Sequence, residues 1–312
     1  MNRMMMTVGA MLVAVAGLQA QQVTLKQDWT AGDYLWSLQA KQNVTVTLPD
    51  GQEMPAQTDD LRVVCQITVK GLPQDQRSFT FQVKEIRQEM QTPMGAMSYD
   101  SANPTSRNPM LRREYEPLLN TAVEMIVGSD GKIVEIKGVD EINSQLQPFG
   151  LGSRVASALY GEDKLRELLK PSEFPASPVS VGQTWVTTQD VPMAELGQGK
   201  LQMQTILQEV RQSPQGPLAV VKGEGTLKAG GGAAEEGMPQ EVTFQIQAAT
   251  VHNLNRNLSQ ESKGRMKGKF EAGGPGQVAT IDQETLITLT PGRYQPPAQT
   301  QPSQDKVPAS QP

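Results

Sequence analysis

Few residues in this chain of 312 have the chemistry of a catalytic centre. It contains one histidine, His252, and one cysteine, Cys65. A serine or cysteine nucleophile activated by histidine would have to use His252. Cys65 shares the apolar positions of a predicted strand, which indicates a core residue, and no Gly-x-Ser-x-Gly stretch offers a nucleophile elbow. One histidine and one cysteine also cannot build a zinc site of the usual kind.

Neighbouring carboxylates could supply acid–base catalysis, but simpler roles explain them. Asp59-Asp60 and Glu235-Glu236 are expected in solvated turns. Asp100 ends a predicted strand, where its side chain could fix a loop by bonding to the backbone. Six Phe, five Tyr and three Trp are few for the aromatic platforms that glycosidases use. We therefore expect that the protein is not an enzyme and uses no cofactor or metal. A carboxylate-based hydrolase remains as an alternative, ranked below the two functions described at the end of this section.

Met90, Met94, Met97 and Met110 form a methionine cluster in the sequence. Thioethers suit Cu(I), whereas adaptable packing is the ordinary use of methionine. Positions 90, 94 and 97 do not share one face of a single strand, and a proline and a glycine interrupt the segment. The spacing therefore favours packing over a metal site.

Four cations, Lys263, Arg265, Lys267 and Lys269, alternate with smaller or apolar residues along one predicted strand. Such a row could contact anionic lipid headgroups or acidic glycans. It could equally form a solvated strand face whose lysines discourage edge pairing. The whole chain is acidic, with 28 Lys+Arg against 33 Asp+Glu, a net charge of −5 and 4% aromatic residues. That balance excludes nucleic acid as the expected partner.

Alternation of apolar and polar residues with a period of two indicates that most of the chain forms strands with one buried face. A slip of this pattern at Glu85-Ile86 indicates a β-bulge, and Ser129-Asp130-Gly131 is a hairpin signal. The expected strands are residues 34–48, 61–70, 79–86, 123–127, 133–137, 184–189, 201–211, 218–228, 241–254, 262–270 and 278–289.

The period changes to that of a helix between about residues 139 and 174, where Val139, Ile142 and Leu146 share one helical face. A shorter helix over residues 111–119 would be limited by Pro117 to one or two turns. The expected fold class is mainly β with a few helices (α+β). We predict a long, curled antiparallel sheet in two halves, half-barrel-like, with a central helical segment.

Residues 1–20 have the parts of a cleavable signal peptide: Arg3, an apolar run, and Ala20 at the cleavage point. The run is shorter than the about 20 residues that span a membrane, and no cysteine follows the cut to carry a lipid anchor. We therefore expect a periplasmic or secreted product that is not an integral membrane protein. One β-rich domain would cover residues 21–294, with halves at about 21–138 and 178–294 joined by residues 139–174. Residues 295–312, rich in Pro and Gln, are expected to be a disordered tail.

Several motifs resemble a family of exported bacterial proteins known only as a domain of unknown function. They are WTAGDY at residues 29–34, MGAMSYDS at 94–101 and GSDGKIVEIKG at 128–138, and PVSVGQTW at 178–185 fits the opening of the second half. The resemblance implies export and a β-rich fold. It carries no known activity, so it assigns no catalytic residue. The expected architecture is also similar to curled half-barrels that carry lipoproteins or lipids across the periplasm, a likeness of shape alone.

The predicted function is a non-catalytic binding protein of the cell envelope that shelters an apolar ligand, such as a lipid or acyl chain. The candidate ligand contacts are apolar residues expected on the inward face of the sheet: Trp36, Leu38, Phe79, Phe81, Phe244 and Ile246. The same residues would serve equally well to pack against the central helices. The alternative is therefore an envelope structural or interaction protein with a packed core and a protein partner, acting through strand edges or the tail.

Overall fold

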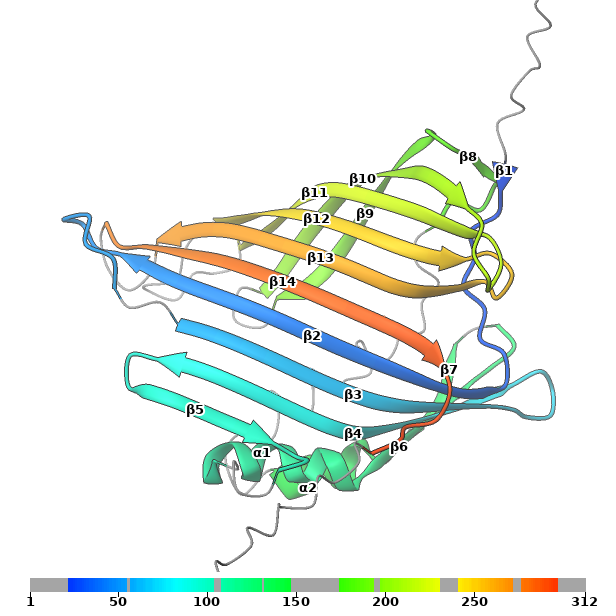
Figure 1. Ribbon diagram of the computed structural model, residues 1–312, viewed down its shortest axis with the longest axis horizontal. Helices are drawn as coiled ribbons and strands as arrows, with labels where there is room; N and C mark the ends of the chain where they lie inside the picture. The colour runs from blue at the N-terminus through cyan, green and yellow to red at the C-terminus, as the bar shows by residue number, and fades with distance from the viewer. Residues whose placement is uncertain are drawn as a thin grey trace, which may run out of the picture.

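The computed structural model of this protein describes residues 22–54, 57–103, 108–130, 132–146, 174–193, 197–230, 241–271 and 276–296. These residues are mainly β, as the alternation predicted. Twelve strands form one large antiparallel sheet that is not closed into a barrel. Figure 1 shows that the sheet curls, so that in this view β9, at one edge of the sheet, passes behind β11, β12 and β13.

The sheet consists of two meanders that meet in its middle. The first contains β2 (Gly32–Thr47), β3 (Gln57–Gly71), β4 (Arg77–Thr92), β5 (Gly95–Asp100), β6 (Ala122–Val127) and β7 (Ile133–Lys137). The second contains β9 (Thr184–Met193), β10 (Gly197–Arg211), β11 (Leu218–Gly230), β12 (Glu241–Asn253), β13 (Leu258–Glu271) and β14 (Val278–Pro291). The order β7-β6-β4-β3-β2-β14-β13-β12-β11-β10-β9 joins the halves through β2 and β14, and β5 pairs with β4.

The register places apolar residues opposite one another across neighbouring strands. Trp36 of β2 lies opposite Cys65 of β3 on one side and Leu289 of β14 on the other. Because side chains alternate between the two faces of a strand, this register gives the sheet an apolar face and a polar face. We call the face that carries Trp36 the apolar face, and the face that carries its neighbour Ser37 the polar face.

A bulge in β4 confirms the slip in the sequence pattern. The pairing passes from Cys65–Val83 to Val64–Glu85, which leaves Lys84 as the extra residue. Because of this extra residue, Val83 and Ile86 both point into the core, with 3% and 0% of their surfaces exposed.

Two helices, α1 (Pro109–Asn120) and α2 (Val139–Leu146), lie beside the β4 and β5 end of the sheet (Figure 1). The expectation of one or two turns around Pro117 was wrong, because α1 runs through this proline for 12 residues. Tyr115 and Leu118 flank Pro117 and are buried in the core, and this packing compensates for the hydrogen bond that proline cannot make. No helix in the described ranges is long and apolar enough to cross a membrane.

The predicted helical segment begins as expected, since α2 buries Ile142 completely. Residues 147–173 lie outside the described residues, as do the predicted signal peptide and residues 297–312 of the predicted tail. A two-stranded sheet of β1 (Gln22–Val23) and β8 (Val179–Ser180) links the start of the described chain to the start of the second meander.

Candidate ligand-binding face

On the apolar face, the first half of the sheet carries a core that is filled by protein side chains. Phe79 and Phe81 are each 3% exposed, and their rings stack with centroids 6.4 Å apart. Trp29 packs edge-on against Phe79 at 5.9 Å, and α1 adds Tyr115 and Leu118 to the same cluster. Both phenylalanines, which the sequence placed among the ligand contacts, therefore lie inside this core rather than at an open surface.

The other four candidate contacts lie at different depths on the same face. Phe244 is 2% exposed and belongs to a small cluster with Leu227 and Val242. Ile246 is partly buried against that cluster. Trp36 and Leu38 are partly buried against the first-half core. The structure thus brings all six onto one face but leaves Trp36, Leu38 and Ile246 nearest to solvent.

Between these partly buried residues, a band of small side chains crosses the apolar face. One cross-strand row of the register runs from β2 to β10 through Ala40, Thr285, Gly264, Ala248, Gly223 and Thr205. We call this row the small-residue band. Within the described part of the chain, a Cβ added at Gly264 would meet nothing nearer than the Gln247 carbonyl oxygen at 3.9 Å, so no described residue fills the space above it. At Gly223 the corresponding Cβ would lie 2.8 Å from Met203 Cε, so Met203 covers that end.

The apolar face carries no charge over the described residues of β2 and β10 to β14. On β2 this face carries the even-numbered residues, and each of them from Tyr34 to Val46 is uncharged. On the adjacent β14 it carries the odd-numbered residues, and each of them from Ala279 to Leu289 is uncharged as well. The corresponding residues of β11 to β13 are apolar, small or hydroxyl-bearing, apart from His252. A partly exposed surface of this composition excludes charged groups and suits an apolar partner.

The predicted row of four cations does lie on one face of β13, the polar face, but it is paired with acids. Arg265 donates from Nε and Nη2 to the two carboxylate oxygens of Asp282 at 2.9 and 2.7 Å. Lys267 Nζ lies 3.1 Å from Asp282, and Lys263 Nζ lies 2.9 Å from Glu261. The hydrogen bonds from Arg265 hold the pKa of Asp282 at about 2. Three of the four cations are therefore neutralised in cross-strand or same-strand ion pairs.

An open depression of about 510 Å³ lies on the polar face above β11 to β14 and β2. Its rim carries Lys41, Lys222 and Arg265, together with Glu224 and Glu284. Lys41 is paired with Asp60 at 3.1 Å, and Arg265 lies 3.5 Å from Glu284. Because the depression mixes both charges at an exposed surface, it selects no single class of ligand.

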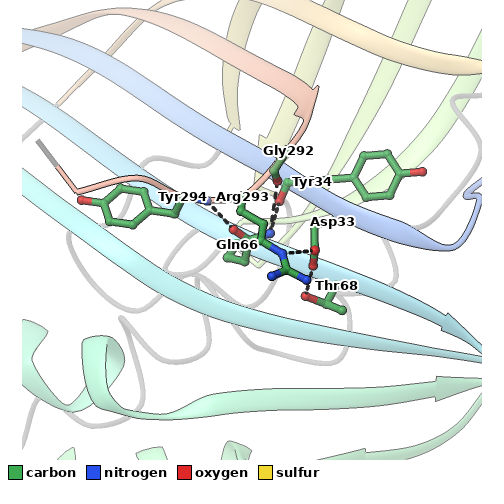
Figure 2. Close-up of polar contacts among 7 residues, drawn as sticks. All are labelled: Asp33, Tyr34, Gln66, Thr68, Gly292, Arg293 and Tyr294. Carbon is green, nitrogen blue, oxygen red and sulfur yellow. Dashed lines mark hydrogen bonds and ion pairs between the residues drawn. The ribbon is translucent and has the colours of Figure 1, made fainter.

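A polar network fastens the end of β14 to β2 and β3 on the polar face. Arg293 Nε donates to Asp33 at 2.6 Å, and Thr68 Oγ1 donates to the other oxygen of the same carboxylate at 2.7 Å. These bonds lower the pKa of Asp33. Gln66 accepts a hydrogen bond from the backbone N–H of Tyr294 at 2.7 Å. Figure 2 shows the whole network, formed by Asp33, Tyr34, Gln66, Thr68, Gly292, Arg293 and Tyr294. Its role is structural, because it holds the two halves of the sheet together.

The histidine and the cysteine lie on strands β12 and β3, which three other strands separate, and do not form a catalytic pair. Cys65 is buried in the first-half core, and burial raises the pKa of its thiol to about 12. His252 is fully buried near the ends of β11 to β13, with its Nδ1 3.2 Å from Ser259 Oγ and the ring of Phe174 at 5.1 Å. Among the described residues, its Nε2 has no hydrogen-bond partner. Burial lowers the pKa of His252 to about 4, although a contact to the Lys26 backbone acts in the opposite direction.

The expectation that Asp59 and Asp60 lie in a turn was wrong, since both belong to β3. Gln88 Nε2 donates to both carboxylate oxygens of Asp59 at 3.0 and 3.1 Å, and Gln88 accepts from the Tyr115 hydroxyl at 2.8 Å. Burial raises the pKa of Asp59. The sequence did contain a signal that Asp59 points toward the core. Asp59 occupies an odd position of β3, as do the apolar residues of that strand from position 61 onward.

Of the remaining candidate acids, Asp100 makes a local backbone contact and Glu235-Glu236 is not described by the structure. Asp100 accepts a hydrogen bond from the Ala102 backbone N–H at 2.8 Å, which is the loop-fixing role expected from sequence. Glu235-Glu236 lies outside the described residues. Within the described ranges, no group of three or more His, Cys, Asp or Glu side chains is placed to hold a metal ion.

Solved structures share only a distant likeness with this chain. A lipovitellin structure, whose title concerns lipid–protein interactions, is 12% identical with a TM-score of 0.45; the match covers 86% of this chain and 26% of lipovitellin. An outer membrane channel from Pseudomonas putida F1 is 7% identical, with a TM-score of 0.23 and coverage of 85% and 97%. The β domain of the Bordetella autotransporter BrkA is 8% identical, with a TM-score of 0.21 and coverage of 82% and 99%. These values are too low to bear on function.

The sequence itself gives a firmer assignment. None of the curated proteins matches it. The model of a protein family, however, matches residues 75–269, from the turn before β4 to β13. This match spans more than half of the chain and agrees with the resemblance seen in its motifs. The protein therefore belongs to DUF6263, a family of unknown function.

Proposed function

We propose that this protein is a non-catalytic binding protein of the cell envelope that holds a lipid or acyl chain against the apolar face of its open sheet. The observation that carries the proposal is the small-residue band, with Leu38 and Ile246 partly exposed on either side of it. An uncharged face that solvent still reaches is costly for a protein on its own, and an apolar ligand would remove that cost.

The dimensions of the small-residue band support an elongated ligand. The band crosses six strands, and neighbouring strands lie about 4.8 Å apart, so it is roughly 24 Å long. One leaflet of a membrane is about half of its roughly 30 Å hydrocarbon core, so the band is long enough for a single acyl chain. Small residues along its floor leave room for the chain, while the larger side chains on both sides supply dispersion contacts.

The proposal includes export. Residues 1–20 would be removed near Ala20, so that the mature chain begins just before β1 at Gln22. β1 pairs with β8, and Val23 and Leu25 are buried in a cluster with Val179. A mature N-terminus at this point would therefore be held in the fold. Intact-mass analysis of the protein purified from the periplasm tests this step independently of ligand binding.

Uptake of a lipid tests the binding step. Delipidated protein should bind a fluorescent fatty acid, and Gly264→Leu should weaken this binding at least about tenfold, because leucine would fill the open space above Gly264. Lys263→Leu is the matched control, since it puts the same side chain on the polar face one residue away. If folded Gly264→Leu bound the fatty acid with the same affinity as the wild type, the proposal would be wrong.

A further inference from the structure

The hairpin of β4 and β5 arranges methionines in a way that the sequence spacing did not indicate. Met90 of β4 and Met97 of β5 are direct cross-strand partners. Met94 lies in the turn between them, where Thr92 pairs with Gly95. Met90 and Met97 do not share a face on a single strand, but the chain reversal places them opposite each other, so their side chains project on the same face of the hairpin.

Core packing explains only one of these three side chains. Met97 is partly buried and packs against the first-half core. Met90 is half-buried and belongs to none of the core clusters. Met94 is 96% exposed at the tip of the hairpin. The thioether of Met94 is therefore accessible to a ligand from solvent.

The geometry of the pair allows two sulfurs to bind one ion. Directly opposed residues in an antiparallel ladder have Cβ atoms about 4.5–5.5 Å apart. Methionine has three flexible torsions beyond its backbone, which let the Sδ atoms of Met90 and Met97 converge. The Met94 side chain, only three residues from Met97 in a tight turn, is free to supply a third thioether.

The donor set identifies the class of ion. Thioether sulfur is a soft ligand that selects Cu(I) and similar ions over Zn(II), Ca(II) or Mg(II). The carboxylate nearest in register is Asp59, opposite Met90 on β3, and both of its oxygens already accept hydrogen bonds from Gln88. Among the described residues paired in register with these methionines, the hairpin therefore offers sulfur donors without a free carboxylate.

We propose that the β4–β5 hairpin binds a soft monovalent cation, Cu(I) or its analogue Ag(I), through the thioethers of Met90 and Met97, with Met94 as a third ligand. This site is separate from the small-residue band, which lies across β2 and β10 to β14. The failure of either proposal, lipid binding or ion binding, would therefore leave the other untouched.

Isothermal titration calorimetry of the purified protein with Ag(I) tests the site without redox chemistry. We expect one Ag(I) ion to bind per hairpin, and Met90→Leu or Met97→Leu to weaken that binding at least about tenfold, because leucine keeps the volume and removes the sulfur. Met266→Leu, on β13, is the matched control and should bind like the wild type. Met94→Leu should have a smaller effect than either strand variant.

The buried thiol of Cys65 is the competing ligand, so the titration is repeated in Cys65→Ala. Retention of the Met90-dependent and Met97-dependent binding in that background supports the hairpin site. Ag(I) binding that disappears with Cys65, or that is equal in Met90→Leu, Met97→Leu and Met266→Leu, would overturn the proposal. A wild-type protein that binds no Ag(I) would overturn it as well. Circular dichroism on every variant shows whether the fold is retained.

Discussion

The two halves of the sheet share an antiparallel meander but differ in what lies on their apolar face. In the first half, aromatic rings and the helix α1 form one buried core that includes Phe79, Phe81 and Tyr115. In the second half, smaller clusters at the strand ends flank the small-residue band, which runs through Gly223, Ala248 and Gly264. The comparison teaches that one strand pattern can give either a filled core or an open surface. The size of the inward side chains and the presence of covering elements decide which results.

The largest expected difference concerns core truncation. Phe81→Ala should lower the free energy of unfolding by about 3–5 kcal/mol, because it opens a cavity in the first-half core. Ile246→Ala should cost much less, about 1 kcal/mol, because its side chain is only partly buried and solvent can fill the space. Urea unfolding of the two variants measures both values. Equal losses would show that the second half is packed as tightly as the first.

Two glycines of β13 sharpen the comparison within the second half. Gly268→Ala should destabilise the protein by about 1–3 kcal/mol, because the new Cβ would collide with the ring of Phe244. Gly264→Ala should be neutral or slightly stabilising, since among the described residues its Cβ would meet only the Gln247 carbonyl oxygen at 3.9 Å and glycine is unfavourable in a strand. Thermal unfolding compares them. A larger loss at Gly264 than at Gly268 would mean that the small-residue band is covered.

Buried His252 makes the second half sensitive to acid. Its pKa is lowered to about 4 in the folded protein, against 6.5 in the unfolded chain. As the pH falls below 6.5, the unfolded chain binds the proton first, so stability decreases; about 2 kcal/mol should be lost between pH 7 and pH 5. The packed surroundings are the Ser259 hydroxyl, the Phe174 ring and the Lys26 backbone, while the side chains of Lys26 and Arg256 are exposed.

Unfolding of His252→Phe over the same pH range isolates this contribution. The variant should lack the part of the pH dependence that His252 causes, whereas Asp59, whose raised pKa acts in the opposite direction, stays unchanged. If the free energy of unfolding depended on pH in the same way in the wild type and in His252→Phe, protonation of His252 would not destabilise the folded protein, and the account would be wrong on this point.

The smallest effect is expected on the polar face. Arg265→Gln removes the two hydrogen bonds to Asp282, yet both side chains are partly exposed, so the loss should be at most about 1 kcal/mol. The loss should shrink further in 1 M salt, which screens surface charges. A large, salt-independent loss would show that this ion pair holds the sheet together, and that the row of cations on β13 is not a free binding surface.

Sequence reasoning recovered most strands of the large sheet and the bulge of β4, because both follow from the alternation of apolar and polar residues along one strand. The short strands β1 and β8 were not among the expected strands, and β5 was expected only at its end. Sequence reasoning also missed features that depend on pairing between strands. Met90 and Met97 become neighbours only through the register of the hairpin, and Asp59 meets Gln88 only across β3 and β4. The length of α1 was underestimated because burial of Leu118 outweighs the local effect of Pro117.

The candidate ligand contacts show the same limit. Parity along each strand predicted correctly that Trp36, Phe81 and Ile246 share one face. Parity cannot say which of them other elements cover, and α1 with the N-terminal segment around Trp29 covers the first-half residues. Depth on that face is a property of the tertiary fold, so Gly264 rather than Phe81 is the position at which to test ligand binding.

Native mass spectrometry of the exported protein, before and after organic extraction, tests the central claim most directly. The account predicts an additional lipid-sized mass on the wild type and on Lys263→Leu, lost on extraction and absent from folded Gly264→Leu. A wild-type protein that carries no additional mass and takes up no added lipid would contradict it. The small-residue band would then be a property of the sheet and not a binding surface.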